Sequence, residues 1–368
     1  MTIGFFGPTL CTPAMTQPAP LRRPATLLAL ILSGLMAAAA HAAPTYVATL
    51  LDTPAADNCY LNDVNEKGQV VGACISAETG GYTAYATTAK GKRTNAVGLL
   101  TGTQSWTNGI NDAGVMVGDA TIEGDAISHG WIKTPDGAMI DLGTLGGDNS
   151  IAVDINNKGL IVGFSQVDAS SVFAGFVIQP GTTALVRIKS LGGSFTRLTT
   201  SNLKGVVIGS SQLPGDLETR AFYSRPPYNK PVMLDSLGGP NSAAQAINDQ
   251  GTIVGSTQVA VSKLRRAYKA QVGSNAITEL PTPAGRPATA TGINNQGVIV
   301  GTYQDPSTST NIAFSCAGEC TTFTNLNTVT TGLAPGVVLT NAQRVNDKGM
   351  ITAVGSDSRL YLLLPQAQ

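Results

Sequence analysis

The sequence contains few charged, aromatic and histidine residues. Charged side chains account for 12% of its 368 residues and aromatic side chains for 5%, and there are two histidines. Basic and acidic residues are equal in number, 23 of each, so the charge balance attracts neither nucleic acid nor an anionic membrane. Few charges and abundant glycine are typical of an exported β-protein.

Helical periodicity is also missing. After residue 42 no segment repeats apolar residues at helical spacing for more than two turns, which excludes a helical solenoid. A catalytic triad is not expected either, because His129 is the only histidine beyond residue 42.

The N-terminus has the pattern of a signal peptide. Arg22-Arg23 is followed by an apolar run over residues 25–36 and by Ala40-His41-Ala42, a small-x-small cleavage pattern. The run is shorter than the ~20 residues of a transmembrane helix. We therefore expect residues 1–42 to be a signal peptide, with Met15 as an alternative start. We expect the mature protein to be secreted or periplasmic, without stable membrane insertion.

A short phrase recurs along the rest of the chain. An apolar residue, Asn, two residues and Gly are followed by a β-rich run that ends on another Gly. The repeated asparagines are Asn65, Asn111, Asn156, Asn202, Asn248, Asn294 and Asn346, at intervals of 46, 45, 46, 46, 46 and 52 residues. In the last copy we take Gly355 as the closing glycine. A period in this range indicates a repeat architecture.

Each repeat divides into four short β segments. In the third copy, residues 150–155 alternate in polarity, and Asn156 to Gly159 form a turn in which Gly supplies a positive φ. Residues 160–164, 173–178 and 184–191 are the next three segments. An aromatic residue follows a small one 20 residues after the Asn in six copies, and Leu-Gly-Gly recurs between copies.

Four antiparallel strands per repeat predict an all-β fold, a seven-bladed β-propeller over residues 43–368. The seventh copy has no room for its fourth strand after Tyr361, whereas residues 45–51 form an extra strand before the first copy. We expect residues 45–51 to pair with residues 358–364 and close the ring, which removes exposed sheet edges.

Four cysteines follow residue 42, and an even number in an exported protein suggests disulfides. Cys59 and Cys74 lie equally far from the Glu66-Lys67 turn, so a two-residue hairpin places them opposite, whereas a G1 bulge would point them apart. Cys316 and Cys320 flank a tight turn. The alternative to two bridges is a zinc site, for which no histidine is nearby.

Three phrases resemble the bacterial extracellular repeat family called HAF, after its His-Ala-Phe strand. They are Leu-Gly-Gly-x-x-Ser, Ile-Asn-x-x-Gly-x-Val-Gly and the small-aromatic pair, and they cover residues 45–364. Most copies here lack the His. The resemblance implies export and a repeated β-fold, and it implies no activity and no catalytic residue.

One basic position recurs two residues before the aromatic, and its members are His129, Arg220, Arg266 and Arg359. With Arg265 beside Arg266, these side chains could hold an anionic ligand. The alternative is that each caps a loop in its own blade. The Asn-x-x-Gly turns are interpreted as turn chemistry, not as cation sites.

These features favour a non-catalytic binding or interaction scaffold, with its ligand on the funnel face that carries the variable loops. We expect a protein or glycan partner, no nucleic acid, no cofactor and a monomer. The alternative is a carbohydrate-active hydrolase or lyase that uses two loop carboxylates. The candidate carboxylates are Glu78, Glu123, Asp125, Asp148, Asp168, Asp216, Glu218 and Asp305.

Overall fold

The computed structural model describes residues 44–53, 59–76, 80–94 and 97–366. The expected signal peptide lies outside these residues. Within them the chain forms short strands and three single-turn 3-10 helices: η1 (Glu123–Asp125), η2 (Pro283–Gly285) and η3 (Leu326–Thr328).

The strands form a succession of antiparallel groups in chain order. The first group has three strands, β2 (Cys59–Val64), β3 (Val70–Ile75) and β4 (Tyr82–Ala86). The second has four, β5 (Ser105–Ile110), β6 (Met116–Thr121), β7 (Ser128–Lys133) and β8 (Ile140–Asp141). The third has β9 (Ser150–Ile155), β10 (Ile161–Gln166), β11 (Phe173–Ile178) and β12 (Val186–Arg187).

The later groups follow the same plan. The fourth has β13 (Thr196–Ser201), β14 (Val207–Gln212), β15 (Thr219–Ser224) and β16 (Val232–Met233). The fifth has β17 (Gly238–Ile247), β18 (Thr252–Val259), β19 (Arg265–Gln271) and β20 (Ile277–Glu279). The sixth has β21 (Ala288–Ile293), β22 (Ile299–Gln304), β23 (Asn311–Cys316) and β24 (Thr324–Asn325).

The last group joins the two ends of the described chain. Its strands are β26 (Leu339–Val345), β27 (Ile351–Gly355), β28 (Leu360–Pro365), β1 (Tyr46–Leu50) and β25 (Thr330–Thr331), in that spatial order. The expected pairing of residues 45–51 with residues 358–364 is present, with antiparallel register from Tyr46–Pro365 to Leu50–Tyr361. The short parallel strand β25, which the sequence did not reveal, covers the outer edge of β1.

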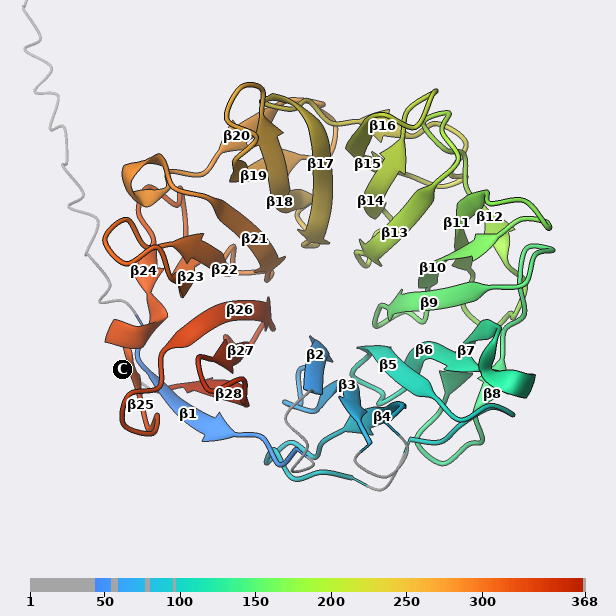
Figure 1. Ribbon diagram of the computed structural model, residues 1–368, viewed down its shortest axis with the longest axis horizontal. Coiled ribbons are helices and arrows are strands. Elements are labelled where there is room, and N and C mark those ends of the chain that lie inside the picture. Colours follow the sequence, from blue (N-terminus) through green and yellow to red (C-terminus); the bar gives the residue numbers. More distant parts are fainter. Residues whose placement is uncertain (1–43, 54–58, 77–79, 95–96, 367–368) are drawn as a thin grey trace, which may run out of the picture. The chain divides into compact units, whose positions relative to one another are not determined.

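Within residues 44–366 the first strand of each group is the innermost one (Figure 1). Successive first strands are in contact, and β2 contacts both β5 and β26. These strands run towards the Asn-x-x-Gly turns. We call that side the turn end, and the opposite side, where the variable loops emerge, the loop end. All-β structure with four-stranded antiparallel sheets, as predicted, is therefore observed.

The repeated turn is built as the sequence predicts. In the third group, the Asn156 side-chain oxygen accepts hydrogen bonds from the backbone N–H groups of Lys158 and Leu160, at 2.9 and 3.1 Å. Gly159 has φ +84°, the left-handed region that glycine adopts without strain. The predicted fourth strand, in contrast, is reduced from residues 184–191 to Val186–Arg187.

The repeated glycine and the repeated aromatic residue are cross-strand neighbours. Gly118 pairs with Trp131, and Gly163 with Phe176. A Cβ at Gly118 would collide with the Trp131 ring and with the Trp106 carbonyl. In the last group this register position is Ala353, opposite Tyr361, rather than the Gly355 that we took as the closing glycine.

Both predicted disulfides form, Cys59–Cys74 and Cys316–Cys320. The first hairpin does contain the turn bulge that would have separated its cysteines, with Gly68 at φ +77°. A second bulge at Asn62 shifts the register back, so Cys59 lies opposite Cys74. Two compensating bulges therefore give the same outcome as a simple two-residue turn.

Candidate functional site

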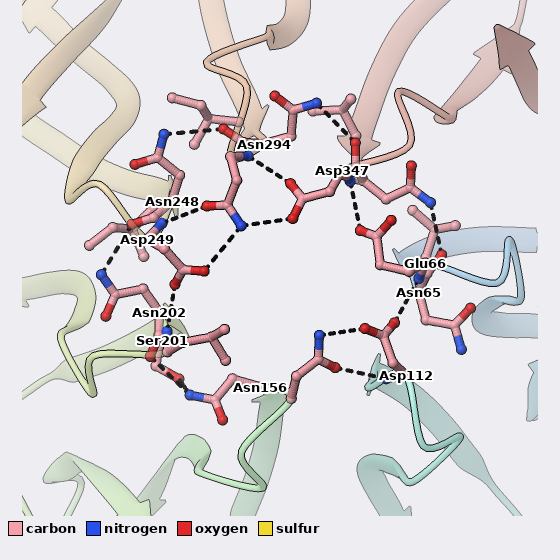
Figure 2. A pocket seen from close by; sticks show the side chains of 18 of the residues that line it. Asn65, Glu66, Asp112, Asn156, Ser201, Asn202, Asn248, Asp249, Asn294 and Asp347 are labelled. Carbon is pink, nitrogen blue, oxygen red and sulfur yellow. Dashed lines mark hydrogen bonds between the residues drawn. The ribbon is translucent and has the colours of Figure 1, made fainter.

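The seven repeated asparagines are linked to one another at the turn end, where Figure 2 shows Asn65, Asn156, Asn202, Asn248 and Asn294. Each side-chain amide donates a hydrogen bond to the backbone carbonyl of the next repeated Asn, at distances of 2.9 to 3.5 Å. The series leads from Asn65 through the other six and returns from Asn346 to Asn65. The turn residue therefore also joins neighbouring groups, which a turn-only interpretation missed.

The residue after each asparagine forms a second set of contacts. The backbone N–H of Glu66 donates to Asp112, that of Asp249 to Asn295, and that of Asp347 to Glu66, at 2.6 to 2.8 Å. Leu203 has no side-chain acceptor and interrupts the set. These side chains surround a depression of about 210 Å³. The carboxylates there already accept backbone hydrogen bonds, so this end is organised for cohesion.

Deeper along the axis, a cavity of about 160 Å³ contains Asp63, Asp154 and Arg344. Burial, reinforced by the nearby Asp154 charge, raises the pKa of Asp63 to about 7, although Arg344 and backbone N–H groups oppose this. Burial also raises the pKa of Asp154, whose carboxylate accepts a 2.6 Å hydrogen bond from Thr200. Arg344 is the cation between these two groups.

At the loop end a third cavity, of about 310 Å³, opens among the first strands. Its lining residues come from five groups: Asn62, Trp106, Asn108, Asp119, Ile151, Val153, Phe164, Arg197 and Arg344. We call this cavity the loop-end pocket. Its volume falls at the lower end of the range typical of ligand pockets, roughly 300–1,000 Å³.

Three residues that line the loop-end pocket, Trp106, Ile151 and Arg197, occupy the position at which the first strands differ most. Five residues before the repeated Asn, successive copies carry Tyr60, Trp106, Ile151, Arg197, Ala243, Thr289 and Asn341. Aligning the copies on their Asn would have shown this variation, which our reading of the sequence overlooked. The large residues are in the first four groups, so one part of the pocket differs from the rest.

Aromatic rings border that part. Tyr82 lies between Tyr60 and Trp106, with ring centroids 5.9 and 5.2 Å apart, and the Tyr60 side of this row is open, since Tyr60 is 53% exposed. Phe164 contacts Phe173 and Phe195. These rings offer flat apolar faces to a ligand.

Two arginines provide the positive charge. The Arg197 guanidinium lies 5.6 Å from the Phe164 ring centroid, and among the described residues no hydrogen bond or ion pair engages it. Arg344 donates only from Nη1, to the carbonyls of Thr291 and Gln343, at 3.3 and 3.1 Å. Partial desolvation by the surrounding strands and the Arg344 charge lower the pKa of Arg197, although the residue remains exposed to solvent.

One carboxylate faces the same pocket. Asp119 accepts hydrogen bonds from Asn108 at 2.8 Å and from Ser128 at 3.2 Å. Burial raises the pKa of Asp119 to about 6, despite these hydrogen bonds. The group is thus about half protonated near pH 6 and mostly ionised at neutral pH.

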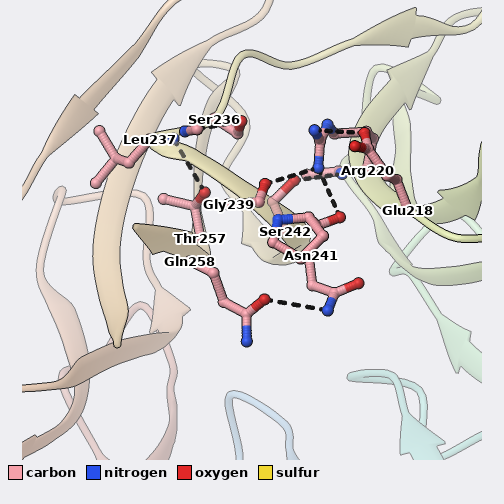
Figure 3. Close-up of polar contacts among 12 residues, drawn as sticks. Glu218, Arg220, Ser236, Leu237, Gly239, Asn241, Ser242, Thr257 and Gln258 are labelled. Atoms are coloured by element: carbon pink, nitrogen blue, oxygen red, sulfur yellow. Dashed lines mark hydrogen bonds and ion pairs between the residues drawn. The ribbon is translucent and has the colours of Figure 1, made fainter. Parts of the chain in front are cut away.

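Four of the basic residues singled out in the sequence, His129, Arg220, Arg265 and Arg266, lie on third strands, away from the axis, and Arg359 directly precedes β28. Arg220 donates to the carbonyls of Gly239 and Pro240 and pairs with Glu218 at 2.7 Å (Figure 3). Arg266 pairs with Glu279 at 3.1 Å, and His129 with Asp141 at 2.8 Å. These contacts match the alternative in which each caps its own region. Arg265 is exposed, and no side-chain partner is found for it among the described residues.

The loop carboxylates have structural partners in several cases. Asp125 accepts from Thr103 and Thr121, Asp216 from Ser194, and Asp305 from Ser307 and Thr308. These hydrogen bonds lower the pKa of all three, the opposite of what a general acid requires. Glu78 lies outside the described residues.

In the described part of the chain, no three or more His, Cys, Asp and Glu side chains gather in a metal-binding arrangement. Among the same residues, no helix is both long enough and apolar enough to cross a membrane. The two disulfides fit an oxidising compartment.

No family model and no curated protein matches this chain. Solved structures do. The β-propeller domain of the trilobed protease from Pyrococcus furiosus is 12% identical, with a TM-score of 0.57, covering 84% of this chain and 94% of that one. A puromycin-hydrolysing peptidase from Mycobacterium tuberculosis is 11% identical, with a TM-score of 0.55, covering 85% of this chain and 52% of that one.

A prolyl endopeptidase is 10% identical, with a TM-score of 0.56, covering 82% of this chain and 47% of that one. This chain therefore spans about half the length of the two peptidases. At these identities the likeness shows the fold alone, which is that of a β-propeller.

Proposed function

We propose that residues 43–368 form a closed seven-bladed β-propeller that is exported after loss of residues 1–42 and belongs among the HAF-type repeat proteins. Seven strand groups, the pairing of β1 with β28 and the return of the asparagine series to Asn65 support closure. The two disulfides support a secreted or periplasmic location. We propose that the protein acts as a monomer.

Its function in this proposal is to bind a protein or glycan at the loop end without catalysing a reaction. The supporting observation is the loop-end pocket, where Arg197 has no anionic partner and Trp106 lines the wall. Side chains that neighbouring groups do not need for their own cohesion are available to a ligand.

The second candidate function is cleavage of a carbohydrate, by a hydrolase or a lyase reaction. One observation favours it: Asp119 lies in the same pocket, and its raised pKa suits a general acid. The loop carboxylates named from the sequence give it less support, because those with lowered pKa values remain ionised.

The test is an array of glycans and peptides probed with the purified protein and three variants. The pocket variant combines Trp106→Ala with Arg197→Gln. The outer variant combines Arg220→Ala, Arg265→Ala and Arg266→Ala, which also tests the basic position found in the sequence. The turn variant is Asn157→Ala.

We expect the pocket variant to lose binding while the outer and turn variants retain it. Binding that survives in the pocket variant, with folding intact, contradicts the proposal. Loss in the outer variant alone moves the site to the third strands. Release of products from a bound glycan, abolished by Asp119→Asn, favours the enzymatic candidate.

A further inference from the structure

The chemistry of the loop-end pocket narrows the class of ligand, and this inference rests on the binding function proposed above. The pocket combines three kinds of group: aromatic faces, guanidinium groups with unused donors, and side chains that accept hydrogen bonds. A ligand that satisfies all three must have apolar faces, a negative charge and hydroxyl or N–H donors.

The aromatic faces favour flat or ring-shaped segments. Trp106 lines the pocket, and the Tyr82 and Tyr60 rings extend from it in a row towards solvent. Such a row can accommodate successive rings of a chain molecule. The C–H face of a pyranose is apolar, and it packs on an aromatic ring as other apolar surfaces do.

The guanidinium groups favour an anion. Arg197 and Arg344 both line the pocket, and each retains N–H donors without a partner among the described residues. Arginine binds carboxylates through paired hydrogen bonds. A singly charged carboxylate suits the site better than a phosphate dianion, because Asp119 lies in the same pocket and Asp63 and Asp154 lie near Arg344.

The acceptors favour a ligand rich in hydroxyl groups. The Asn62 amide donates to Thr107 and Asn108, whereas its side-chain oxygen has no partner among the described residues. Asp119 accepts only two hydrogen bonds from neighbouring side chains. Each sugar ring can donate from several hydroxyl groups to both acceptors, whereas an acidic peptide has only its backbone N–H groups as donors, because its carboxylate side chains can only accept.

We propose that the loop-end pocket binds an acidic oligosaccharide, with a uronate carboxylate on Arg197 and sugar rings against Trp106 and Tyr60. The carboxylate relieves the repulsion between the two guanidinium groups. The rings cover aromatic surface that is otherwise open to water.

Tryptophan fluorescence gives a direct assay, because the protein has two tryptophans and they differ in burial. Trp131 is 0% exposed and lies inside the sheet packing, so a ligand-induced change reports on Trp106. The probe is tetragalacturonate. Its fully methyl-esterified form is the matched control, because it has the same rings and no charge. A tetraglutamate peptide carries the charge without the sugar.

We expect tetragalacturonate to change the emission of the wild type and to leave that of Trp106→Phe unchanged. Arg197→Gln should weaken binding about ten- to a hundredfold, the effect of losing a charge-assisted hydrogen bond. Arg265→Gln, an exposed arginine outside the pocket, should stay within about twofold. Because the Arg197 side chain makes no hydrogen bond or ion pair among the described residues and contacts only the Phe164 ring through its charge, its variant should fold normally, which circular dichroism checks.

Several results would overturn the inference. If the methyl ester binds as tightly as tetragalacturonate, or if Arg197→Gln does not weaken binding, the carboxylate charge of the ligand does not contribute to recognition. If tetraglutamate binds and the saccharide does not, the ligand is an acidic peptide. If neither binds, the ligand is not an acidic molecule. In all these cases the pocket itself stays open to other ligands from the array. Tight saccharide binding that leaves Trp106 emission unchanged and survives the pocket variant contradicts the proposed function as well.

Discussion

The asparagine series predicts that one side chain stabilises both a turn and the contact between neighbouring groups. Asn294 is 4% exposed, and its side chain makes three hydrogen bonds. Its oxygen accepts from the N–H groups of Gln296 and Val298 at 3.1 and 2.8 Å, and its amide donates to the Asn346 carbonyl at 2.9 Å. Replacement by alanine removes all three bonds, whereas replacement by aspartate removes only the donor.

The alanine variant leaves the backbone N–H groups of Gln296 and Val298 without their acceptor, and the Asn346 carbonyl keeps only the hydrogen bond from the Gly349 N–H. An unsatisfied buried group costs about 1–3 kcal/mol. Water in the adjacent depression can satisfy part of this loss, so we expect Asn294→Ala to lower the unfolding free energy by about 3–5 kcal/mol. With roughly 2.1 cal/mol/K of unfolding entropy per residue, that corresponds to a fall of about 4–7 °C in melting temperature.

The aspartate variant separates the two roles. It keeps the acceptor for the turn but places a carboxylate oxygen against the Asn346 carbonyl, so it should also be destabilised at neutral pH. Thermal melting by circular dichroism measures both variants against Asn229→Ala, an exposed asparagine without a side-chain hydrogen bond among the described residues, which should shift stability by less than about 0.5 kcal/mol. If Asn294→Asp melts with the wild type while Asn294→Ala does not, the bond between groups contributes nothing. If both melt with the wild type, the buried-bond reasoning is wrong.

Two further predictions concern the chain ends and pH. A chain that begins at residue 53 should melt well below one that begins at residue 43, because it loses β1 with buried Tyr46 and exposes the edge of β28; equal melting temperatures would rule out a stabilising role for β1. Because the folded pKa of Asp119 is raised to about 6, the folded state binds more protons than the unfolded state, and stability falls as pH rises from about 4 to about 7. Asp119→Asn should remove about 3 kcal/mol of that fall while keeping both hydrogen-bond partners, and an unchanged pH profile of unfolding would show that burial does not raise the pKa of this carboxyl.

The repeat period, the turns and the aromatic positions were predictable because local packing fixes each of them. Gly163 and Phe176 face each other across two strands, and neither tolerates a larger neighbour. Because the same packing constraint applies in nearly every copy, the glycine and the aromatic residue recur at a fixed spacing in the sequence. The Cys316–Cys320 pair was predictable for a related reason, since both cysteines flank one tight turn, whereas the Cys59–Cys74 pair also depends on the bulge at Asn62.

Other features depend on contacts that no local pattern encodes. The bulge at Asn62 and the short strand β25 arise from how strands meet, and neither has a residue type that marks it. The replacement of the repeated glycine by Ala353 was hidden by a nearby Gly355. The outer basic residues shared a repeat position, which suggested a common ligand, yet Arg220 and Arg266 each satisfy their charge close by.

The two ends of the axis explain why the candidate site escaped attention. At the turn end, each copy must supply an acceptor to the copy before it, so Asn and Asp dominate and the sequence is nearly constant. At the loop end, none of the described residues five positions before the Asn makes a side-chain hydrogen bond to a neighbouring group, and the position varies from Ala243 to Trp106. Constancy therefore marks what holds the groups together. In a fold of this kind, the residues to examine for a ligand are the ones that break the repeat while facing the axis, and here these are Trp106 and Arg197.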